Sequence, residues 1–148
     1  MNLEQLSAEI EADEGCVLEV YLDHLGYPTV GVGHLVLESD EEWNKPVGTK
    51  VSLERVRVLL RDDLVRTASD CGKLYNDFSK LPEEAQLIIA NMMFNMGLPR
   101  LSKFKKMKEA VDQRRWNEAA AQMKDSKWYR QVTNRAERLC QRMKALAD

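Results

Sequence analysis

The first fifteen residues carry apolar side chains at helical spacing. Leu3, Leu6 and Ile10 fall on one face at steps of three and four residues, and Glu14 is the next position on that face. Gly15 favours a helix end directly after it. We therefore predict a helix over residues 3–14 whose apolar face ends in a carboxyl group.

Between residues 17 and 35 the pattern becomes typical of strands. Residues 17–22 are rich in β-branched and aromatic side chains, and residues 24–26 (HLG) predict a turn before a second strand. Pro28 indicates that this second strand lies at a sheet edge or begins irregularly. Residues 38–50 read as an acidic loop that ends in a third short strand.

From Ser52 onward the pattern is helical. Ser52 is a typical N-cap, and a buried stripe follows it, formed by Leu53, Val56, Leu60 and Leu64. Pro82 fits the first helical position of a helix that runs to Gly97. This helix is apolar nearly all round, so we expect it to be the central, buried helix of the chain.

Three further helices are predicted in the C-terminal third, around residues 104–111, 116–123 and 136–146, with Thr133 as the N-cap of the last. The chain is therefore expected to be α+β, with a small N-terminal lobe that contains a β-hairpin and a larger, all-helical lobe.

The 148 residues fit one domain, and 44% hydrophobic and 31% charged residues are ordinary for a globular protein. No segment approaches the ~20 apolar residues of a membrane span. The N-terminus has no basic segment followed by an apolar one, so we expect no signal peptide and synthesis in the cytoplasm.

The three cysteines, Cys16, Cys71 and Cys140, lie far apart in the sequence and lack a metal-binding spacing. We therefore expect reduced thiols, no metal and no cofactor.

Charge is distributed unevenly along the chain. Residues 1–99 contain 8 Lys and Arg against 18 Asp and Glu, whereas residues 100–148 contain 14 against 6. The basic half either faces an anionic partner or presents ordinary solvated helix faces that attract the acidic half. Charge alone does not separate these two interpretations.

Glu14 and Asp23 are the candidate chemical groups. A carboxyl group at the end of an apolar helix face is partly desolvated, which favours the protonated form that a general acid needs, although Glu14 could equally pair with an arginine. Asp23 closes the first strand, where an aspartate is common at a turn. Thr29 is expected across from Asp23, and Gly31 and Gly33 leave the same face of the second strand bare, as room for a ligand.

Two other interpretations of this segment are less favoured. The glycines do not form a dinucleotide-binding loop, because position 36 is Val and no helix start follows. His34 is expected to be a hydrogen-bonded structural residue rather than a metal ligand. What remains is a pair of carboxyl groups, one in an apolar and one in a polar setting, and glycosidic hydrolysis is the reaction that most often uses such a pair.

The residues that surround this pair resemble the phage-type lysozyme family, whose members are endolysins and muramidases. "DEG" followed by "YLDHLGYPTVGVGH" reproduces the family's Glu-x8-Asp-x5-Thr pattern at Glu14, Asp23 and Thr29. "ANMMFNMG", "RRWNEAAAQM", "SKWYRQ" and "TNRAERL" are similar to its helical lobe, in the same order.

The resemblance covers nearly the whole chain and implies a single lysozyme-like domain over residues 1–148. Its small lobe would be residues 13–51, its helical lobe residues 1–12 and 70–148, and residues 52–69 would be the connecting helix. The implied activity is hydrolysis of the β-1,4 bond between N-acetylmuramic acid and N-acetylglucosamine of bacterial peptidoglycan. We expect a monomer that needs no nucleic acid, and that acts on the cell wall after its release.

The resemblance also implies a role for each site residue. Glu14 would be the general acid, while Asp23 and Thr29 would hold the attacking water, with Asp23 as its base. Arg135, in the "NRA" motif, would lie near Glu14 and orient it. Four further residues fall where the family lines its substrate cleft: Leu35, Phe94, Met107 and Gln122.

The chain departs from the family in several respects. Met107 and Gln122 differ in type from the usual residues, the segment from His34 to Ser52 is shorter than in the longest relatives, and the overall charge is mildly acidic. The alternatives are a catalytically silent peptidoglycan-binding protein on the same fold and a helical nucleic-acid binder. The second has no recognisable motif.

Overall fold

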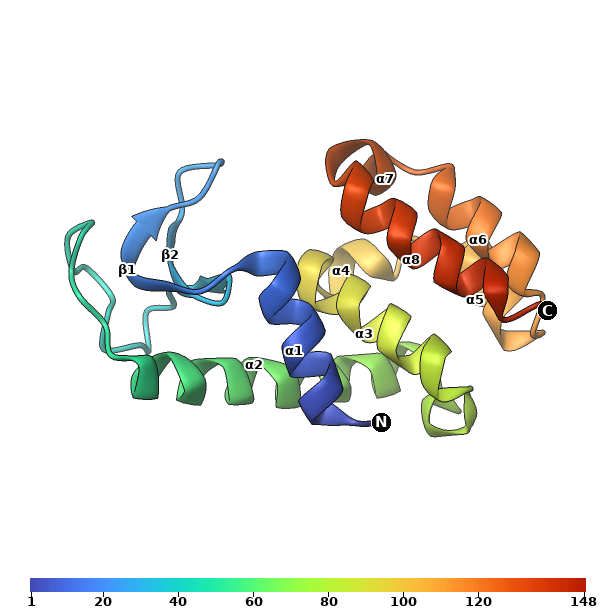
Figure 1. Cartoon of the computed structure of the whole chain (residues 1–148), viewed down its shortest axis with the longest axis horizontal. Helices are drawn as coiled ribbons and strands as arrows, with labels where there is room; N and C mark the ends of the chain where they lie inside the picture. Colours follow the sequence, from blue (N-terminus) through green and yellow to red (C-terminus); the bar gives the residue numbers. More distant parts are fainter. The chain divides into compact units, whose positions relative to one another are not determined.

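The computed structural model describes residues 1–148 and comprises two compact units. One unit is residues 3–66; the other is residues 67–148 together with residues 1–2. The elements in chain order are α1 (Leu3–Glu14), β1 (Val17–Leu22), β2 (Pro28–Gly31), β3 (His34–Leu35), α2 (Leu53–Leu74), the 3-10 helix η1 (Phe78–Lys80), α3 (Glu83–Met96), α4 (Leu98–Leu101), α5 (Lys105–Asp112), α6 (Trp116–Lys124), α7 (Lys127–Gln131) and α8 (Thr133–Ala145) (Figure 1). The small sheet and the mostly helical remainder confirm the predicted α+β fold. The lobe boundaries given above remain a prediction.

The first unit contains a three-stranded antiparallel sheet in the order β1-β2-β3. Tyr21 pairs with Thr29, and Thr29 pairs with Leu35. The expectation of an edge strand at Pro28 is wrong, because β2 is central; Pro28 is its first residue, a position where a strand tolerates proline. The third strand is β3, whereas the acidic loop ends only in an isolated bridge between Lys50 and Glu19.

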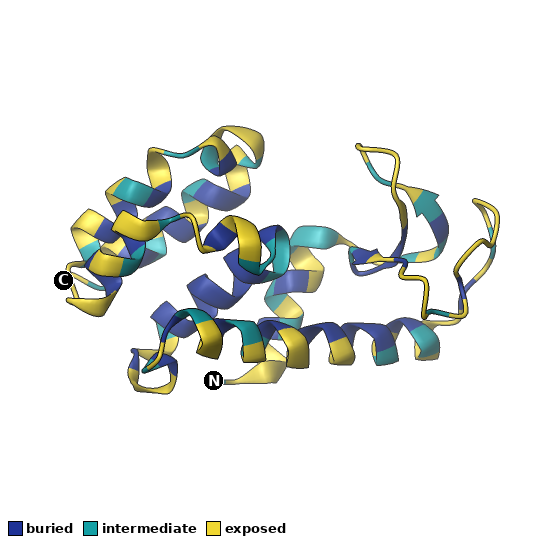
Figure 2. Cartoon of the chain, turned by 180° about the vertical axis from the view of Figure 1, so that it is seen from behind, coloured by how far each residue is buried: buried dark blue, intermediate teal, exposed yellow.

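The helices α1 and α2 of this unit follow the predicted stripes except at their first turns. Leu6 and Ile10 of α1 are fully buried, but Leu3 and Leu53, each the first residue of its helix, are both 44% exposed. Ser52 caps α2 as predicted, since its Oγ accepts a hydrogen bond from the Arg55 amide at 3.0 Å. Figure 2 shows α2 with one buried side and one exposed side along its length.

The C-terminal unit is built around α3, as predicted. Every residue from 85 to 93 is buried, and Gly97, with φ of 81°, ends the helix (Figure 2). Pro82 is the N-cap and not the first helical residue. α8 packs against α3, α6 and α7, and the Arg142 guanidinium donates to both carboxylate oxygens of Glu84 at 3.1 and 2.7 Å, which joins α8 to α3.

Further details of this unit differ from the sequence expectation, and the short helices η1 and α4 have no counterpart in it. Thr133 is the first helical residue of α8 and not its N-cap, and its hydroxyl donates to the Arg130 carbonyl instead. The short helix α7 was not predicted, although Ser126 caps it by accepting a hydrogen bond from the Tyr129 amide at 3.1 Å.

The three cysteines are free thiols, of which Cys16 is exposed. Burial raises the pKa of Cys71 to about 12 and that of Cys140 to about 11, so both are inert thiols at neutral pH. None of the helices combines the length and the apolar character that a membrane crossing requires.

Candidate active site

Glu14 is the last residue of α1, and its side chain is half-buried. Gly15 follows with φ of +79° and donates its amide to the Glu11 carbonyl at 2.8 Å, so the helix ends with a left-handed glycine. The chain then turns directly into β1. The helix end therefore presents the Glu14 carboxylate toward the sheet.

Gly33 makes room for that carboxylate. A Cβ placed on Gly33 would lie 2.7 Å from Oε1 of Glu14, closer than non-bonded atoms allow, and the residue has φ of +61°. Any side chain here would displace Glu14 and strain the backbone. The left-handed backbone conformation favours glycine at this position, and a side chain here would also move the flexible end of Glu14.

Gly31 does not contribute to an open groove, which corrects the sequence interpretation. A Cβ on Gly31 would lie 2.8 Å from Cγ1 of Val56, so the glycine lets α2 approach the sheet. The strand face that was predicted to be open at both glycines is therefore covered by Val56 of α2 at Gly31, and the Glu14 carboxylate lies next to it at Gly33.

Asp23 sits just after β1 and organises the hairpin turn. Its Oδ1 accepts hydrogen bonds from the amides of Leu25 and Tyr27, both at 2.9 Å, and its own amide donates to the Tyr27 carbonyl. This arrangement is the one expected for an aspartate at a turn, which the sequence analysis kept open. The second oxygen, Oδ2, makes no hydrogen bond within the chain and remains an available acceptor.

Thr29 lies opposite Tyr21 and not opposite Asp23 as predicted. Its side chain is buried, and its Oγ1 donates a hydrogen bond to the Tyr27 carbonyl at 2.9 Å. A hydroxyl has one proton and two acceptor sites, so this bond fixes the proton and leaves the acceptor sites open. Asp23 and Thr29 are therefore both anchored to the backbone of Tyr27.

Tyr21 is a member of the site that the sequence analysis did not assign. Burial, followed by the negative charges of Glu14 and Asp23, raises the pKa of Tyr21 above its ordinary value. The phenol is thus close enough to both carboxylates to sense their charge, and it stays neutral at physiological pH. The available signal was the period-two alternation that puts Tyr21 and Asp23 on the same strand face.

His34 is structural, as predicted, but its partners could not be foreseen from spacing. Its Nδ1 lies 2.7 Å from Oδ2 of Asp63, and its Nε2 lies 2.7 Å from Oδ2 of Asp40. Burial lowers the pKa of His34, but the hydrogen bonds and charges of Asp63 and Asp40 outweigh burial and raise the pKa above 6.5. Both ring nitrogens face carboxylates, so the geometry suits an imidazolium that donates twice.

A second ion pair ties the acidic loop to α2. Glu42 is buried, and its two carboxylate oxygens accept hydrogen bonds from Nε and Nη2 of Arg55 at 3.0 and 2.9 Å. The bonds from Arg55 outweigh burial and lower the pKa of Glu42. Together with the bonds of His34, this pair fixes the segment that follows the candidate site.

The remaining predicted residues, except Leu35, lie in the C-terminal unit. Arg135 is buried, and its Nε donates to Oδ1 of Asn91 at 2.8 Å, which fixes the guanidinium between α8 and α3. Asn95 similarly accepts a bond from Nε1 of Trp128 at 2.7 Å. The predicted contact between Arg135 and Glu14 would join the two units, and it stays a prediction.

The predicted cleft residues differ in exposure. Leu35 is 47% exposed and pairs with Thr29, so it shares a sheet face with the candidate site. Phe94 and Gln122 are half-buried, and Gln122 donates to Glu118 at 3.0 Å. Met107 is fully shielded from solvent, so its side chain supports the wall of the unit and does not itself offer a contact surface.

Met107 and Gln122 border a cavity of about 370 Å³ in this unit. Its wall also includes three lysines and one aromatic residue: Lys103, Lys105, Lys106 and Phe104. The Phe104 ring packs edge-on against Trp128, with 6.5 Å between ring centroids. The cavity therefore combines an apolar wall with a basic rim.

The comparisons with known proteins match this chain to one family. The family model described as phage lysozyme matches residues 11–145, a range that includes Glu14, Asp23, Thr29 and Arg135. Probable T4-type lysozymes 2 and 1 of Dictyostelium discoideum are similar at 27% and 29% identity, each over 88% of this chain and 88% of the relative.

A third relative is much longer. Peptidoglycan hydrolase gp36 of Pseudomonas phage phiKMV is 31% identical over 92% of this chain, which corresponds to 14% of the phage protein. The family match spans most of the chain, and the α+β fold agrees with it. The chain therefore belongs to the phage lysozyme family and is a glycoside hydrolase.

Proposed function

We propose that this protein is an endolysin-type muramidase that hydrolyses the β-1,4 bond between N-acetylmuramic acid and N-acetylglucosamine in bacterial peptidoglycan, with inversion at the anomeric carbon. Family membership and the similarity to a peptidoglycan hydrolase support peptidoglycan as the substrate. The observation that carries the mechanism is the pair of acceptors that Thr29 and Asp23 offer, together with Tyr21, on which the charges of Glu14 and Asp23 both act.

A water molecule would be held by its two protons. The Thr29 proton is committed to the Tyr27 carbonyl, so Oγ1 can only accept, and Oδ2 of Asp23 can only accept while ionised. A water that donates to both atoms directs a lone pair away from them, toward the sugar. Asp23 would then take a proton from this water as its oxygen attacks the anomeric carbon.

Glu14 would supply the proton to the leaving oxygen of the glycosidic bond. Its position at the helix end, against the Gly33 backbone, limits the conformations of the carboxyl group. Tyr21 lies close to both carboxylates and is a neutral phenol. It therefore adds no charge that would favour ionisation of Glu14 over Asp23, or the reverse. Arg135 is proposed to orient Glu14 from the C-terminal unit.

The proposed mechanism is a single displacement. A water between base and sugar requires the two carboxyl groups to be roughly 6.5–9.5 Å apart, against about 5–5.5 Å when a carboxylate attacks directly. The nine-residue step from Glu14 to Asp23 leaves a helix end and runs along a strand before it reaches the turn. We therefore propose a wide pair and an α-anomer as the first product.

Substrate contacts are proposed from both units. Leu35 offers an exposed apolar side chain on the face of Thr29, and Phe94 and Gln122 offer half-buried surface in the C-terminal unit. The lysines around the 370 Å³ cavity suit the anionic cell wall. We propose that the enzyme acts as a monomer on the cell wall, without nucleic acid, after synthesis in the host cytoplasm.

The test is mass spectrometry of the fragments released from purified peptidoglycan, together with proton NMR of a soluble glycan oligomer in the first minutes of hydrolysis. Fragments with reducing N-acetylmuramic acid are expected, with the α-anomer first. Reducing N-acetylglucosamine or anhydro ends would overturn the muramidase proposal. An initial β-anomer would overturn only the roles given to Asp23 and Thr29.

The alternative is a catalytically silent protein that binds peptidoglycan on the same fold. Intact Glu14, Asp23 and Thr29 favour the enzyme. A turbidity assay on bacteria with a permeabilised outer membrane separates the two, because a silent binder associates with the walls and does not clear the suspension.

A further inference from the structure

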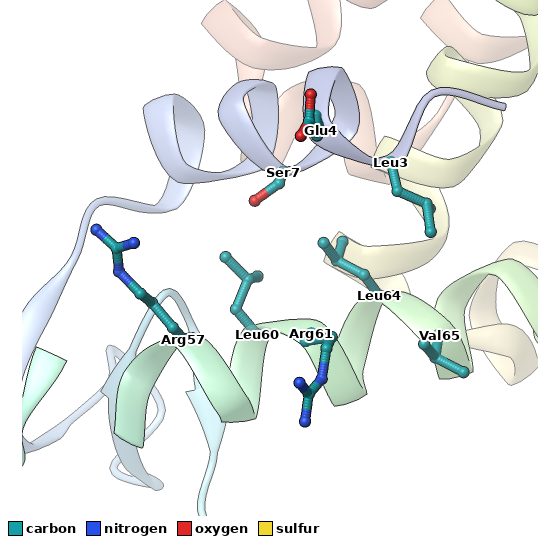
Figure 3. A pocket seen from close by; sticks show the side chains of 8 residues that line it. All are labelled: Leu3, Glu4, Ser7, Arg57, Leu60, Arg61, Leu64 and Val65. Carbon is teal, nitrogen blue, oxygen red and sulfur yellow. The ribbon is translucent and has the colours of Figure 1, made fainter. Parts of the chain in front are cut away.

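A pocket of about 350 Å³ lies between α1 and α2, within the unit of residues 3–66. Figure 3 shows Leu3 reaching from α1, and Leu60 and Leu64 reaching from α2, into the space between the two helices. Its wall is mostly apolar. None of the residues discussed for catalysis lines it, so it is separate from the candidate active site.

The pocket has an apolar end and a polar end. Leu3 and Leu64 lie toward the start of α1, whereas Ser7 and Arg57 lie at the other side, where the Ser7 hydroxyl points into the gap and the Arg57 side chain extends toward α1 (Figure 3). The Glu4 carboxylate points away from α2. The only charge directed at this end of the pocket is therefore positive.

Arg57 is exposed at the edge of the pocket and has no partner within the protein. Neither its guanidinium nor the Ser7 hydroxyl makes a hydrogen bond or ion pair within the chain. By contrast, Arg55 is bonded to Glu42 and Arg66 to Asp63. In a unit where acidic residues far outnumber basic ones, an arginine without an acidic partner beside an apolar pocket suits an anionic ligand.

We propose that this pocket binds a small anionic amphiphile, a carboxylate with a hydrocarbon chain of medium length. The chain would lie between Leu3, Leu60 and Leu64, and the carboxylate would accept hydrogen bonds from Arg57 and Ser7. The volume fits a small molecule, since ligand pockets begin at about 300 Å³. The wall offers too few polar groups for a sugar. The acidic surface of the unit disfavours an anionic membrane as the source.

The experiment is an NMR and calorimetric titration of the full chain with sodium octanoate, 1-octanol and sodium acetate. Octanoate is expected to bind and to shift the signals of Ser7, Leu60 and Leu64. Octanol, which lacks the charge, should bind about tenfold more weakly, as expected for loss of a hydrogen-bonded ion pair. Acetate, which lacks the chain, should not bind measurably.

Two variants test the two ends of the pocket. Arg57→Gln should reduce the affinity for octanoate to that for octanol and leave octanol unchanged. Leu3→Ser, at an exposed position that should fold normally, should weaken both ligands. Arg61→Gln is the matched control. Arg61 also borders the pocket, but its guanidinium points away from α1 in Figure 3, so the variant should leave both affinities unchanged.

Three results would overturn the proposal: no binding of octanoate at millimolar concentration, equal affinity for octanoate and octanol, or equal effects of the Arg57 and Arg61 variants. A further arm uses phosphatidylglycerol vesicles. Binding to vesicles without binding of octanoate would replace the small molecule by a membrane surface and overturn the proposal as stated. Lytic activity plays no part in these readouts, so the proposal stands apart from the proposed function.

Discussion

The two units of the molecule are stabilised by different interactions. The unit of residues 3–66 has 6 Lys and Arg against 14 Asp and Glu, and it buries charged side chains: His34, Asp63 and Glu42. The unit of residues 67–148 has 16 against 10, and its center is the apolar helix α3. One unit thus adds several buried, paired charges to its apolar core. The other relies mainly on apolar packing, with Arg135 and the pair of Glu84 and Arg142 between α3 and α8.

The difference follows from how much apolar surface each unit can bury. A sheet of three short strands, one of only two residues, offers little core of its own. Paired buried charges fix its loops instead, through His34 with its two aspartates and Glu42 with Arg55. The unit that carries Glu14 and Asp23 should therefore respond to pH between 5.5 and 9. The unit of residues 67–148 should not respond in this range, because the pKa of Glu84 is lowered by its bond from Arg142 and that pair is lost only at acidic pH.

The largest expected effect is on activity in the acidic unit. Glu14→Gln keeps the shape of the side chain and removes the transferable proton, so the lytic rate should fall at least about 100-fold while the melting temperature stays the same. The measurement is clearing of permeabilised cells together with thermal unfolding. Glu11→Gln is the matched control, because Glu11 is an exposed carboxyl group one turn earlier on α1. Retention of more than a few per cent of activity would exclude Glu14 as the acid.

The second effect is on stability. His34→Asn removes one of the two cationic partners of buried Asp63, which keeps its bond from Arg66, and should lower the free energy of unfolding by about 2–3 kcal/mol near pH 5.5. The folded-state pKa of His34 is raised, so its contribution is complete below the ordinary value of 6.5 and is lost as pH rises through the folded-state pKa. Urea unfolding between pH 5 and 9 should show the loss shrink with rising pH.

The matched control for this variant is His24→Asn, because His24 is exposed in the hairpin turn. It should leave stability unchanged at every pH. Asp40 limits, at the acidic end, the pH range in which its ion pair with His34 stabilises the protein. Burial raises the pKa of Asp40, but the bonds from His34 and Leu37 outweigh burial and lower it. Its contribution is present above the ordinary value of 3.8 and is lost as pH falls through the lowered value. An equal loss at pH 5.5 and pH 9 would contradict the imidazolium assignment.

A third prediction concerns the apolar unit. Ile88 is fully buried in α3, and Ile88→Ala should lower the free energy of unfolding by about 2–5 kcal/mol through lost burial and a cavity. No titratable partner is removed, so this loss should be the same at pH 5.5 and pH 9. A loss that varied with pH as strongly as that of the His34 variant would remove the distinction between the units.

The sequence predicted the features that depend on local periodicity. Helix and strand repeats fix which side chains share a face, so Glu14 could be placed at the end of an apolar stripe and Asp23 at the end of a strand. Their proposed catalytic roles come from the resemblance to the lysozyme family and not from periodicity. Helix α3 and the Ser52 cap were predictable for the same reason.

Features that depend on distant partners were not predictable. Asp63 follows His34 by 29 positions, and no spacing rule connects a strand end to the middle of a helix. The pairing of Thr29 with Tyr21 depends on a register that shifts between Val17 and Tyr21. Gly31 was assigned to a groove because the approach of Val56 is a tertiary contact that periodicity does not encode.

A fourth prediction separates stability from activity within the acidic unit. Gly31→Ala and Gly33→Ala both force a side chain onto a left-handed residue, so each should lose about 1 kcal/mol or more of stability. Only the Gly33 variant also crowds Glu14, and only it should lower the activity per folded molecule, by about tenfold for a displaced catalytic group. Equal specific activities of the two folded variants would contradict the role given to Gly33.

The smallest expected effect is electrostatic and concerns the unit of residues 67–148. Lys103, Lys105 and Lys106 rim the cavity beside Gln122, whereas Lys108 is engaged by Asp112 at 2.7 Å. If the three rim lysines attract the anionic cell wall, lysis should fall as salt rises, because exposed charges are screened beyond about 8 Å at about 0.15 M. The triple Lys→Gln variant should lyse cells more slowly at low salt, and its rate should depend less on salt, with little change in stability.

The control is the double variant Lys45→Gln with Lys50→Gln, in the unit of residues 3–66. It should keep the salt dependence of the unmodified enzyme. A triple variant with that same salt dependence would show that these lysines form only a solvated surface, the interpretation that charge alone left open.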